Sequence, residues 1–425
     1  MSNSTRLFWS ILKTTLRSKH FVPICLISAF IIRMCWIHFV NPEPVSDFGW
    51  YFHRAVDISQ GKGYSSGGTP TGYWPVGYSA FLGALFFIFG PSLYVGKMAN
   101  VILYMGILFL AYRLARRLFK SEITGRTTLA ILSFYPNHIA YCSLLASEIL
   151  FLFLLLCAVN LLVVETPRVS KAILSGIIFG LGCLVKPQSV FLPAIFFGAT
   201  LTKRIREKTL RETLVFFLIA YASVALTLLP WEIRNYRKFE HFVFVTTYGG
   251  INLFIGNNPD ATGSYTVNEK MEEMLKGARN EYERDRKAGA LALEYIKQHP
   301  SGIVKLLPRK LYYLYYKDVE GIDWNERGIE STQTRSIMFF ERFKILAQGY
   351  YMFIMTASLL GILVFLGKKS YRARFPASST VGLSVISYFT IVGLVFFGHA
   401  RFHFPIVPWV TMYLGALVDT SLTSR

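Results

Sequence analysis

The sequence predicts an all-α polytopic membrane protein with about ten transmembrane helices, and three observations support this fold class. Only 16% of the 425 residues are charged and 53% are hydrophobic, which gives a mean hydropathy of +0.39. Soluble globular chains carry about 25% charged residues. Apolar runs of roughly 20 residues, the length that crosses a bilayer, recur along the chain, and basic residues gather in the short loops between them. These features exclude a soluble enzyme, a disordered tail and a compact disulfide scaffold.

The charges divide the chain into two kinds of sequence. Trp231–Lys344 holds 16 of the 25 acidic residues and 18 of the 45 basic ones, a net charge of +2. The rest of the chain has a net charge of +18. One segment is therefore ordinary water-exposed protein, and the remainder is apolar sequence joined by basic loops. Because the basic residues sit where membrane topology requires them, the pI of 9.7 does not indicate a nucleic-acid partner.

Ten segments are expected to span the membrane, because lipid offers no partner for a bare backbone and only a helix satisfies its own N–H and C=O groups. They are Phe21–Val40, Leu93–Leu114, Thr127–Leu145, Ile149–Val164, Ala172–Val185, Ser189–Leu201, Thr213–Pro230, Leu346–Leu366, Ala377–Phe397 and Phe402–Val418. The fifth and sixth are short and flank Lys186-Pro187, so they could form one tight helical hairpin. Pro75–Phe89 is also apolar but short, and we expect it to lie at, or dip into, the outer membrane surface.

The loop charges predict the orientation of these spans. With ten spans, the loops on one side hold 21 of the 27 basic residues found outside Trp231–Lys344. Basic loops stay in the cytoplasm, so both termini are expected there. The first span follows about 20 polar and basic residues without a small-residue cleavage site, which is typical of an uncleaved anchor. Two large segments, residues 41–92 and 231–344, are then expected outside.

Three regions follow from this topology. Residues 1–230 form an N-terminal membrane module whose first outer loop, residues 41–92, carries the candidate catalytic residue. Residues 231–344 form a large, mixed but mainly helical outer loop, with two β-like pieces at Phe242–Thr247 and Ile251–Ile255 and a charged helix or helix pair over Glu269–His299. Residues 345–425 form the C-terminal membrane helices.

The first outer loop contains a candidate general base. Ser46 is expected to cap a short helix through its hydroxyl, and helical spacing then places Asp47, Tyr51 and Arg54 on one face. The positive end of the helix dipole would keep Asp47 ionised, as a general base requires. The alternative is that Asp47 only caps the helix. Tyr78 belongs to an aromatic cluster, Tyr73–Tyr78, that suits the membrane interface.

Glu148 is the second acid of interest. Outside Trp231–Lys344, only four acidic residues fall on the outer side of the predicted topology: Glu43, Asp47, Asp57 and Glu148. A carboxylate close to lipid is costly, so it usually has a partner or a function. Glu148 begins the fourth span, where it is either a substrate-binding group or a simple interfacial charge.

Several cations do not fit the cytoplasmic pattern. Lys97, Lys186 and Arg401, together with Arg234 from the large loop, are expected near the outer surface, where they could surround a lipid phosphate. The alternative is that each extends to lipid headgroups. His403, four residues after His399, is expected to be packed or to face a phosphate rather than to bind a metal. Asn257 and Asn258 could bind sugar hydroxyls or simply form a turn.

A series of short motifs occurs in a characteristic order and spacing. They are Ser46–Tyr51, Ala55, Gly61–Tyr64, Tyr73–Tyr78, Phe89–Ser92, Arg116–Phe119, Ser147-Glu148, Pro230-Trp231, Arg234-Asn235, Gly256–Pro259 and Arg401–Pro405. With these motifs the sequence resembles the GT-C superfamily of polytopic glycosyltransferases, in particular the protein-mannosyltransferase-like and aminoarabinose-transferase-like group (glycosyltransferase family 39-like). The resemblance covers most of the chain.

The resemblance implies a function. Members of the superfamily move a sugar from a polyprenyl-phosphate donor on the outer face of the membrane to an acceptor. The family's catalytic acid corresponds to Asp47, and its second functional acid corresponds to Glu148. The expected location is the plasma (inner) membrane, and the acceptor is lipopolysaccharide, another cell-wall glycan or a protein. The sequence requires no cofactor, although a divalent metal is possible. Two alternatives remain open: a transporter or flippase of a lipid-linked sugar, and a glycan ligase or polymerase.

Overall fold

The computed structural model describes residues 3–162, 168–206, 209–329 and 334–423, and this part of the chain is mainly helical. Its helices, in chain order, are α1 (Asn3–Arg17), α2 (Phe21–Phe39), α3 (Asp47–Ser59), α4 (Val76–Phe89), α5 (Leu93–Phe119), α6 (Glu122–Ser133), α7 (Pro136–Tyr141), α8 (Ser147–Leu162), α9 (Val169–Val185), η1 (Pro187–Phe191), α10 (Leu192–Arg206), α11 (Leu210–Phe239), α12 (Gly249–Gly256), α13 (Glu269–Met274), α14 (Glu281–Gln298), α15 (Pro300–Tyr315), α16 (Glu320–Gly328), α17 (Thr334–Gly367), α18 (Lys369–Arg372), η2 (Ala377–Thr380), α19 (Val381–Val395), η3 (Ala400–Ile406) and α20 (Val407–Thr423).

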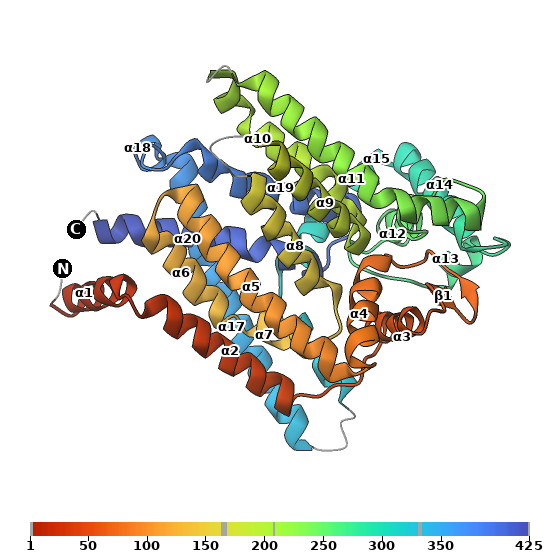
Figure 1. The fold of residues 1–425 in the computed structure, drawn as a ribbon, viewed down its shortest axis with the longest axis horizontal. Coiled ribbons are helices and arrows are strands. Elements are labelled where there is room, and N and C mark those ends of the chain that lie inside the picture. Colours follow the sequence, from red (N-terminus) through yellow and green to blue (C-terminus); the bar gives the residue numbers. More distant parts are fainter. Residues whose placement is uncertain (1–2, 163–167, 207–208, 330–333, 424–425) are drawn as a thin grey trace.

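The helices place the two ends of the chain on one side of the molecule. α1 and the C-terminal end of α20 lie close together, and Leu16 and Leu422 share a small apolar cluster there. The opposite side carries α3, α4 and α12 to α14, together with the short antiparallel pair β1 (Ser65–Ser66) and β2 (Thr69–Pro70) (Figure 1). We call this the loop side. The all-α polytopic fold is confirmed.

Within the described residues, six helices are long and apolar enough to cross a membrane. They cover Phe21–Phe39, Leu93–Phe119, Leu210–Phe239, Ile337–Gly367, Ser378–Val395 and Ala400–Thr423, and each coincides with a predicted span. Four further apolar helices are shorter: Val76–Phe89, Ser147–Leu162, Val169–Val185 and Pro187–Ala199. Three of these coincide with predicted spans and one with the predicted surface segment. The last two residues of the predicted span Ile149–Val164 lie outside the described residues.

The predicted span Thr127–Leu145 is not one helix. It falls on the end of α6, a break at Phe134-Tyr135, and the short helix α7. Pro136 opens α7 and keeps Tyr135 in an extended conformation, with φ −73° and ψ 109°. Proline disfavours the helical conformation of the residue before it, so the helix stops there. All six residues of α7 are nevertheless buried.

Glycines allow the membrane helices to approach closely. A Cβ on Gly176 of α9 would meet the Ala220 carbonyl oxygen of α11 at 2.2 Å. A Cβ on Gly415 of α20 would meet the Thr124 carbonyl oxygen of α6 at 2.7 Å. α9 packs mainly against α8 and α11 rather than α10, so the tight hairpin expected around Lys186-Pro187 does not dominate the packing there.

In the first outer loop, the N-cap of α3 differs from the prediction. α3 begins at Asp47 as predicted, but Ser46 makes no side-chain capping hydrogen bond. Its backbone has φ 56° and ψ −133°, a conformation unlike that of an ordinary N-cap. α3 packs on α4, where a Cβ on Gly83 would meet the Ile58 side chain at 2.7 Å. This packing fixes the position of Asp47 relative to the membrane helices.

The large loop contains helices where strands were expected. Ile251–Ile255 lies within α12, and Phe242–Thr247 forms no strand. A short apolar run has the same appearance in a strand and in a buried helix, so pattern alone misassigned it. The predicted helix pair over Glu269–His299 is present as α13 and α14. α15 begins at Pro300, directly after the end of that predicted pair.

Candidate active site

Four charged side chains from distant parts of the chain meet in one cluster. Nη2 of Arg401 donates to Oδ2 of Asp47 at 2.7 Å. Nε of Arg401 donates to Oε1 of Glu148 at 2.8 Å, and Nη2 lies 3.3 Å from Oε2 of the same residue. Nζ of Lys186 also donates to Oε1 of Glu148, at 3.0 Å. We call Asp47, Glu148, Lys186 and Arg401 the charge cluster.

The charge cluster is largely withdrawn from water. The exposed fraction of the side chain is 1% for Glu148 and 7% for Asp47, against 15% for Arg401 and 20% for Lys186. Two carboxylates and two cations balance, so each member of the charge cluster has a partner of opposite charge. The acids lie deeper than the bases, and the cations are therefore the members that an incoming anion can reach.

Different elements position the four members. Asp47 is the first residue of α3, and the chain there is held close because a Cβ on Gly49 would meet the Pro44 carbonyl oxygen at 2.7 Å. Glu148 stands in the first turn of α8. Lys186 occupies the break between α9 and η1, which Pro187 begins. Arg401 lies in the first turn of η3.

Tyr51 lies beside the charge cluster. It is buried one helical turn after Asp47, and its ring meets the ring of Tyr78 edge-on with centroids 5.3 Å apart. Burial first, and then the Asp47 carboxylate, raise the pKa of the Tyr51 hydroxyl well above its usual range. Tyr51 is therefore a neutral group that can donate a hydrogen bond. Tyr78 instead directs its hydroxyl to Asn100, at 3.5 Å.

Arg54 does not join Asp47, although both lie on α3. Its Nη2 pairs with Oδ2 of Asp57 at 3.0 Å, and its guanidinium lies over the ring of Trp50. An acid three residues away on the same helix is a nearer partner than one seven residues away, so the local pair forms. The expected common face with Asp47 does not become a contact.

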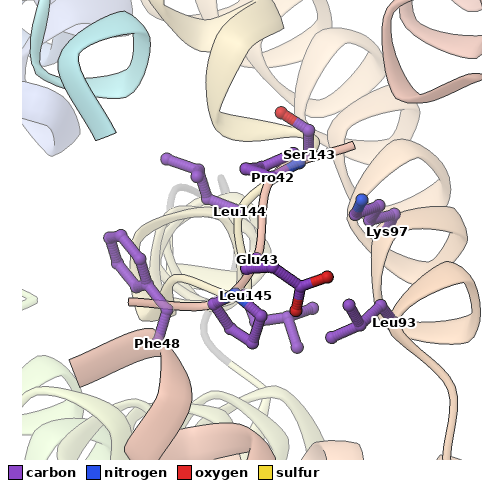
Figure 2. Close-up of a pocket in the computed structure, with 9 residues that line it drawn as sticks. Pro42, Glu43, Phe48, Leu93, Lys97, Ser143, Leu144 and Leu145 are labelled. Atoms are coloured by element: carbon purple, nitrogen blue, oxygen red, sulfur yellow. The ribbon is translucent and has the colours of Figure 1, made fainter. Parts of the chain in front are cut away.

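Lys97 is close to the charge cluster but separate from it. It is buried, and its ammonium donates to the side-chain oxygen of Asn41. Lys97, Glu43 and Phe48 line a narrow cavity of about 10 Å³ (Figure 2), enough for about one water molecule. Phe48 lies between this cavity and the charge cluster, because the guanidinium of Arg401 is 5.2 Å from the centroid of the Phe48 ring.

Arg234 and His403 are engaged within the protein. Arg234 donates from Nη1 to the Thr71 carbonyl oxygen and from Nη2 to the Tyr64 carbonyl oxygen, both at 2.7 Å. His403 is fully buried, with Nε2 3.2 Å from Oδ1 of Asp318 and Nδ1 2.6 Å from the Leu314 carbonyl oxygen. The structure thus does not bring these two residues to the charge cluster, because nearer oxygen atoms occupy them.

Asn257 and Asn258 terminate α12 rather than face the charge cluster. Nδ2 of Asn257 donates to the Leu253 carbonyl oxygen at 2.8 Å, and Nδ2 of Asn258 donates to the Phe254 carbonyl oxygen at the same distance. Both asparagines are buried. Of the two interpretations that the sequence left open, their placement favours the turn.

Sequence reasoning missed two residues that the structure places near this region. Phe48 lies under Arg401, and its neighbour in sequence, Asp47, was the only signal for it. Lys310 is fully buried in α15. Its signal was the cation pair Arg309-Lys310 inside an otherwise apolar and aromatic run, Leu306–Tyr316. Among the described residues, no group of three or more His, Cys, Asp or Glu side chains is placed to hold a metal ion.

Comparison with known proteins shows a partial family match. Residues 74–231 match the family described as dolichyl-phosphate-mannose-protein mannosyltransferase. The match begins within the first loop, ends at the start of the large loop and includes Glu148 and Lys186. No curated protein sequence matches the chain.

Solved structures show the same fold over nearly the whole chain. The oligosaccharyltransferase of Archaeoglobus fulgidus in its apo form matches with a TM-score of 0.56 at 12% identity, covering 96% of this chain and 51% of that one. The same organism's oligosaccharyltransferase AglB, in complex with an inhibitory peptide and a dolichol-phosphate, matches with a TM-score of 0.54 at 13% identity, again over 96% and 51%. ArnT from Cupriavidus metallidurans bound to undecaprenyl phosphate has a TM-score of 0.43 at 13% identity, over 95% and 77%. The chain spans about half the length of the two oligosaccharyltransferase structures.

Proposed function

We propose that the chain is a GT-C-type membrane glycosyltransferase that transfers a sugar from a polyprenyl-phosphate donor to an acceptor at the charge cluster. The family match over residues 74–231 and the fold shared with the oligosaccharyltransferase support this proposal. The observation that carries this proposal is the meeting of Asp47 and Arg401, which lie 354 residues apart in sequence. A carboxylate beside a guanidinium places a proton acceptor next to a phosphate-binding group. A sugar phosphate transfer requires both groups within one site.

The proposed reaction breaks one bond and forms one. An acceptor hydroxyl attacks the anomeric carbon of the donor, the bond from that carbon to the phosphate oxygen breaks, and polyprenyl phosphate leaves with the electron pair. Asp47 accepts the proton of the acceptor hydroxyl. Arg401 and Lys186 stabilise the negative charge that develops on the leaving phosphate, as preorganised cations do at other sites of phosphoryl charge.

The substrate-free geometry suggests how the general base is released. Arg401 here donates to both Asp47 and Glu148, so one oxygen of the Asp47 carboxylate is already occupied. An arriving phosphate competes with Asp47 for Arg401, while Glu148 keeps its contact with Lys186. Donor binding would then free Asp47 to act on the acceptor.

The donor and the membrane side follow from the same arrangement. The complex of the related AglB with a dolichol-phosphate supports a polyprenyl-phosphate donor. Its lipid chain would lie among the membrane helices, with the phosphate at the charge cluster. The charge of the loops between the predicted spans supports an extracytoplasmic active site in the plasma membrane with both termini inside. The acceptor is a glycan of the cell envelope or a protein, and an analysis of the reaction products must identify which.

The roles of the other predicted site residues change accordingly. We retain Asp47 as the general base, Lys186 and Arg401 as phosphate ligands, and Tyr51 and Glu148 beside the substrate. Lys97 remains a candidate at the adjoining cavity. Contacts with substrate are no longer proposed for a set of residues whose side chains are engaged elsewhere in the fold: Arg54, Tyr78, Arg234, Asn257, Asn258 and His403.

The Asp47→Asn variant tests this function. Asparagine keeps the size of the side chain but cannot take up the proton, so transfer should fall at least about a hundredfold while donor binding persists. The measurement is sugar transfer by the purified chain in detergent, with a polyprenyl-phosphate sugar and glycan or peptide acceptors. Asp57→Asn is the matched control on the same helix and should leave transfer nearly unchanged. Equal rates for wild type and Asp47→Asn would remove Asp47 from the mechanism.

A further inference from the structure

A buried lysine, Lys310, holds the C-terminal end of α19. Its Nζ donates to the Leu394 carbonyl oxygen at 3.0 Å and lies 3.5 Å from that of Val395, the last two residues of α19. The carbonyl groups at the end of a helix have no partner within the helix. A cation is also favourable there, because the helix dipole is negative at that end. Lys310 therefore acts as a C-terminal cap supplied by another helix.

Asn257 completes this contact. Its Oδ1 accepts from Nζ of Lys310 at 2.9 Å, and its Nδ2 donates to the Val395 carbonyl oxygen at 3.0 Å. All the oxygen atoms bonded to Lys310 are neutral, and no carboxylate balances its charge among them. Burying an ammonium group in this way is costly. This free-energy cost suggests that the segment held by Lys310 has a function.

The turn after α19 is fitted between two elements of the large loop. A Cβ on Gly398 would meet the Lys310 carbonyl oxygen at 1.9 Å, and a Cβ on Gly256 would meet the Phe396 carbonyl oxygen at 1.6 Å. The Gly398 amide donates to the Gly263 carbonyl oxygen at 2.9 Å. Only glycine fits at these two positions, so the turn has little freedom to move while α12 and α15 stay in place.

The same turn delivers Arg401 to the charge cluster. His399 is the N-cap residue of η3, and its Nδ1 accepts a hydrogen bond from the Arg401 backbone amide at 3.2 Å. Beyond Arg401 the chain is held again, because the Leu314 carbonyl oxygen of α15 contacts Nδ1 of His403 at 2.6 Å. Lys310 and Leu314 lie one turn apart on α15 and secure the chain before and after Arg401. α15 therefore sets the position of the guanidinium.

We infer that Lys310 is a positioning residue for Arg401: by capping α19 it fixes the turn that carries the guanidinium to its carboxylates. The inference deepens the proposed function. It rests on that function in one respect, which is that Arg401 binds the donor phosphate. It assigns to the large loop a direct part in building the active site, with Lys310 and Asn257 as the structural connection. Asn257 thus acts on the turn rather than on a sugar.

The first experiment measures transfer in a double-mutant cycle. Lys310→Met keeps the length of the side chain and removes the cation and its donors, and it should lower kcat/KM for a polyprenyl-phosphate sugar about tenfold or more. In an Arg401→Ala background, Lys310→Met should cause little further loss, because Lys310 acts through Arg401. If Lys310→Met lowers kcat/KM by the same factor with Arg401 and with Ala at position 401, the inference is overturned.

The control is Lys305→Met. Lys305 is an exposed lysine on the same helix, five residues before Lys310, and its replacement should leave kcat/KM unchanged. If Lys310→Met accumulates poorly, Asn257→Ala removes the companion contacts and leaves the lysine in place. That variant should show the same loss on a smaller scale, again only while Arg401 is present. A full-sized effect of Asn257→Ala without Arg401 would contradict the inference.

A second readout does not depend on activity. Amide hydrogen exchange over residues 396–406, followed by mass spectrometry, should be faster in Lys310→Met than in Lys305→Met. Equal exchange in Lys310→Met and Lys305→Met overturns the inference, even if the wild-type chain transfers sugar. A wild-type chain that transfers no sugar would instead refute the proposed function, and the exchange measurement would still decide whether Lys310 fixes the turn.

Discussion

Arg401 and Glu148 form a two-point contact in the charge cluster, with Nε of the guanidinium on one carboxylate oxygen and Nη2 near the other. Arg401 uses the same Nη2 to reach Asp47. Only a planar group with several fixed N–H donors can serve two carboxylates in this way. The geometry therefore specifies arginine rather than any cation at this position.

Arg401→Lys should accordingly impair the enzyme although it preserves the charge. A single ammonium cannot keep both contacts, so the KM for donor should rise and kcat should fall, with a combined loss in kcat/KM of about tenfold to a hundredfold. Steady-state transfer kinetics provide the measurement. Arg342→Lys, an exposed arginine on α17, is the matched control. Kinetics of Arg401→Lys equal to those of the control would show that charge alone is sufficient.

Glu148→Gln should destabilise the protein strongly. The change leaves Lys186 and Arg401 with less negative charge, and removing one partner from a buried ion pair costs about 3–5 kcal/mol. The melting temperature in detergent should drop clearly, while Glu294→Gln, at an exposed position of α14, should leave it nearly unchanged. An unchanged Tm for Glu148→Gln would mean that the two cations need no compensating acid.

Stability should depend on Lys310 between pH 8 and about 10.4. Burial lowers the pKa of Lys310 to about 8 in α15, which lies outside the candidate membrane spans, whereas an unfolded lysine titrates near 10.4. Between these values the unfolded chain binds more protons at this site than the folded chain. The contribution of Lys310 to the free energy of unfolding therefore rises with pH over this window.

Thermal melts of wild type and Lys310→Met across this range provide the measurement. The difference in Tm, wild type minus variant, should increase from pH 8 to pH 10. Lys305→Met should show no such trend relative to wild type, because its side chain is exposed. A difference that stays constant with pH would mean that the folded Lys310 titrates like an unfolded lysine.

The orientation in the membrane can be tested by labelling. In a background without the five native cysteines, Thr69→Cys in β2 should react with a membrane-impermeant maleimide added to intact cells. Lys368→Cys, between α17 and α18, should react only after the cells are permeabilised. Both positions are exposed. The opposite pattern would place the charge cluster on the cytoplasmic side and contradict the proposed donor chemistry.

The sequence alone was sufficient for the class of fold and for several members of the site. Runs such as Phe21–Phe39 are long and apolar enough to indicate a membrane helix without any tertiary information. Asp47 and Glu148 stood out because acids are rare and costly next to lipid. Lys186 and Arg401 stood out because they did not fit the pattern of basic loops. Each of these signals depends on a residue and its immediate neighbours.

Local pattern gave the wrong answer where a short segment has two physical solutions. Ile251–Ile255 is apolar and reads as a strand, but it forms part of α12 because burial against the rest of the loop suits either structure. Arg54 and Asp47 share a helix, but Asp57 is a closer partner. For His403 the sequence left a packed position and a phosphate contact open, and its burial beside Asp318, 85 residues away, favours the packed position.

Sequence by itself identified most of the apolar helices that are long enough to be candidate membrane spans, because the free energy of placing a helix in lipid depends on the composition of that helix. It also identified the costly charges. Only the tertiary structure decided which charges pair, that Lys310 caps α19, and that Asn257 belongs to this contact. Coulomb attraction and hydrogen bonding depend on distances of a few ångströms in space, and sequence separations of 50 to 350 residues carry no information about those distances.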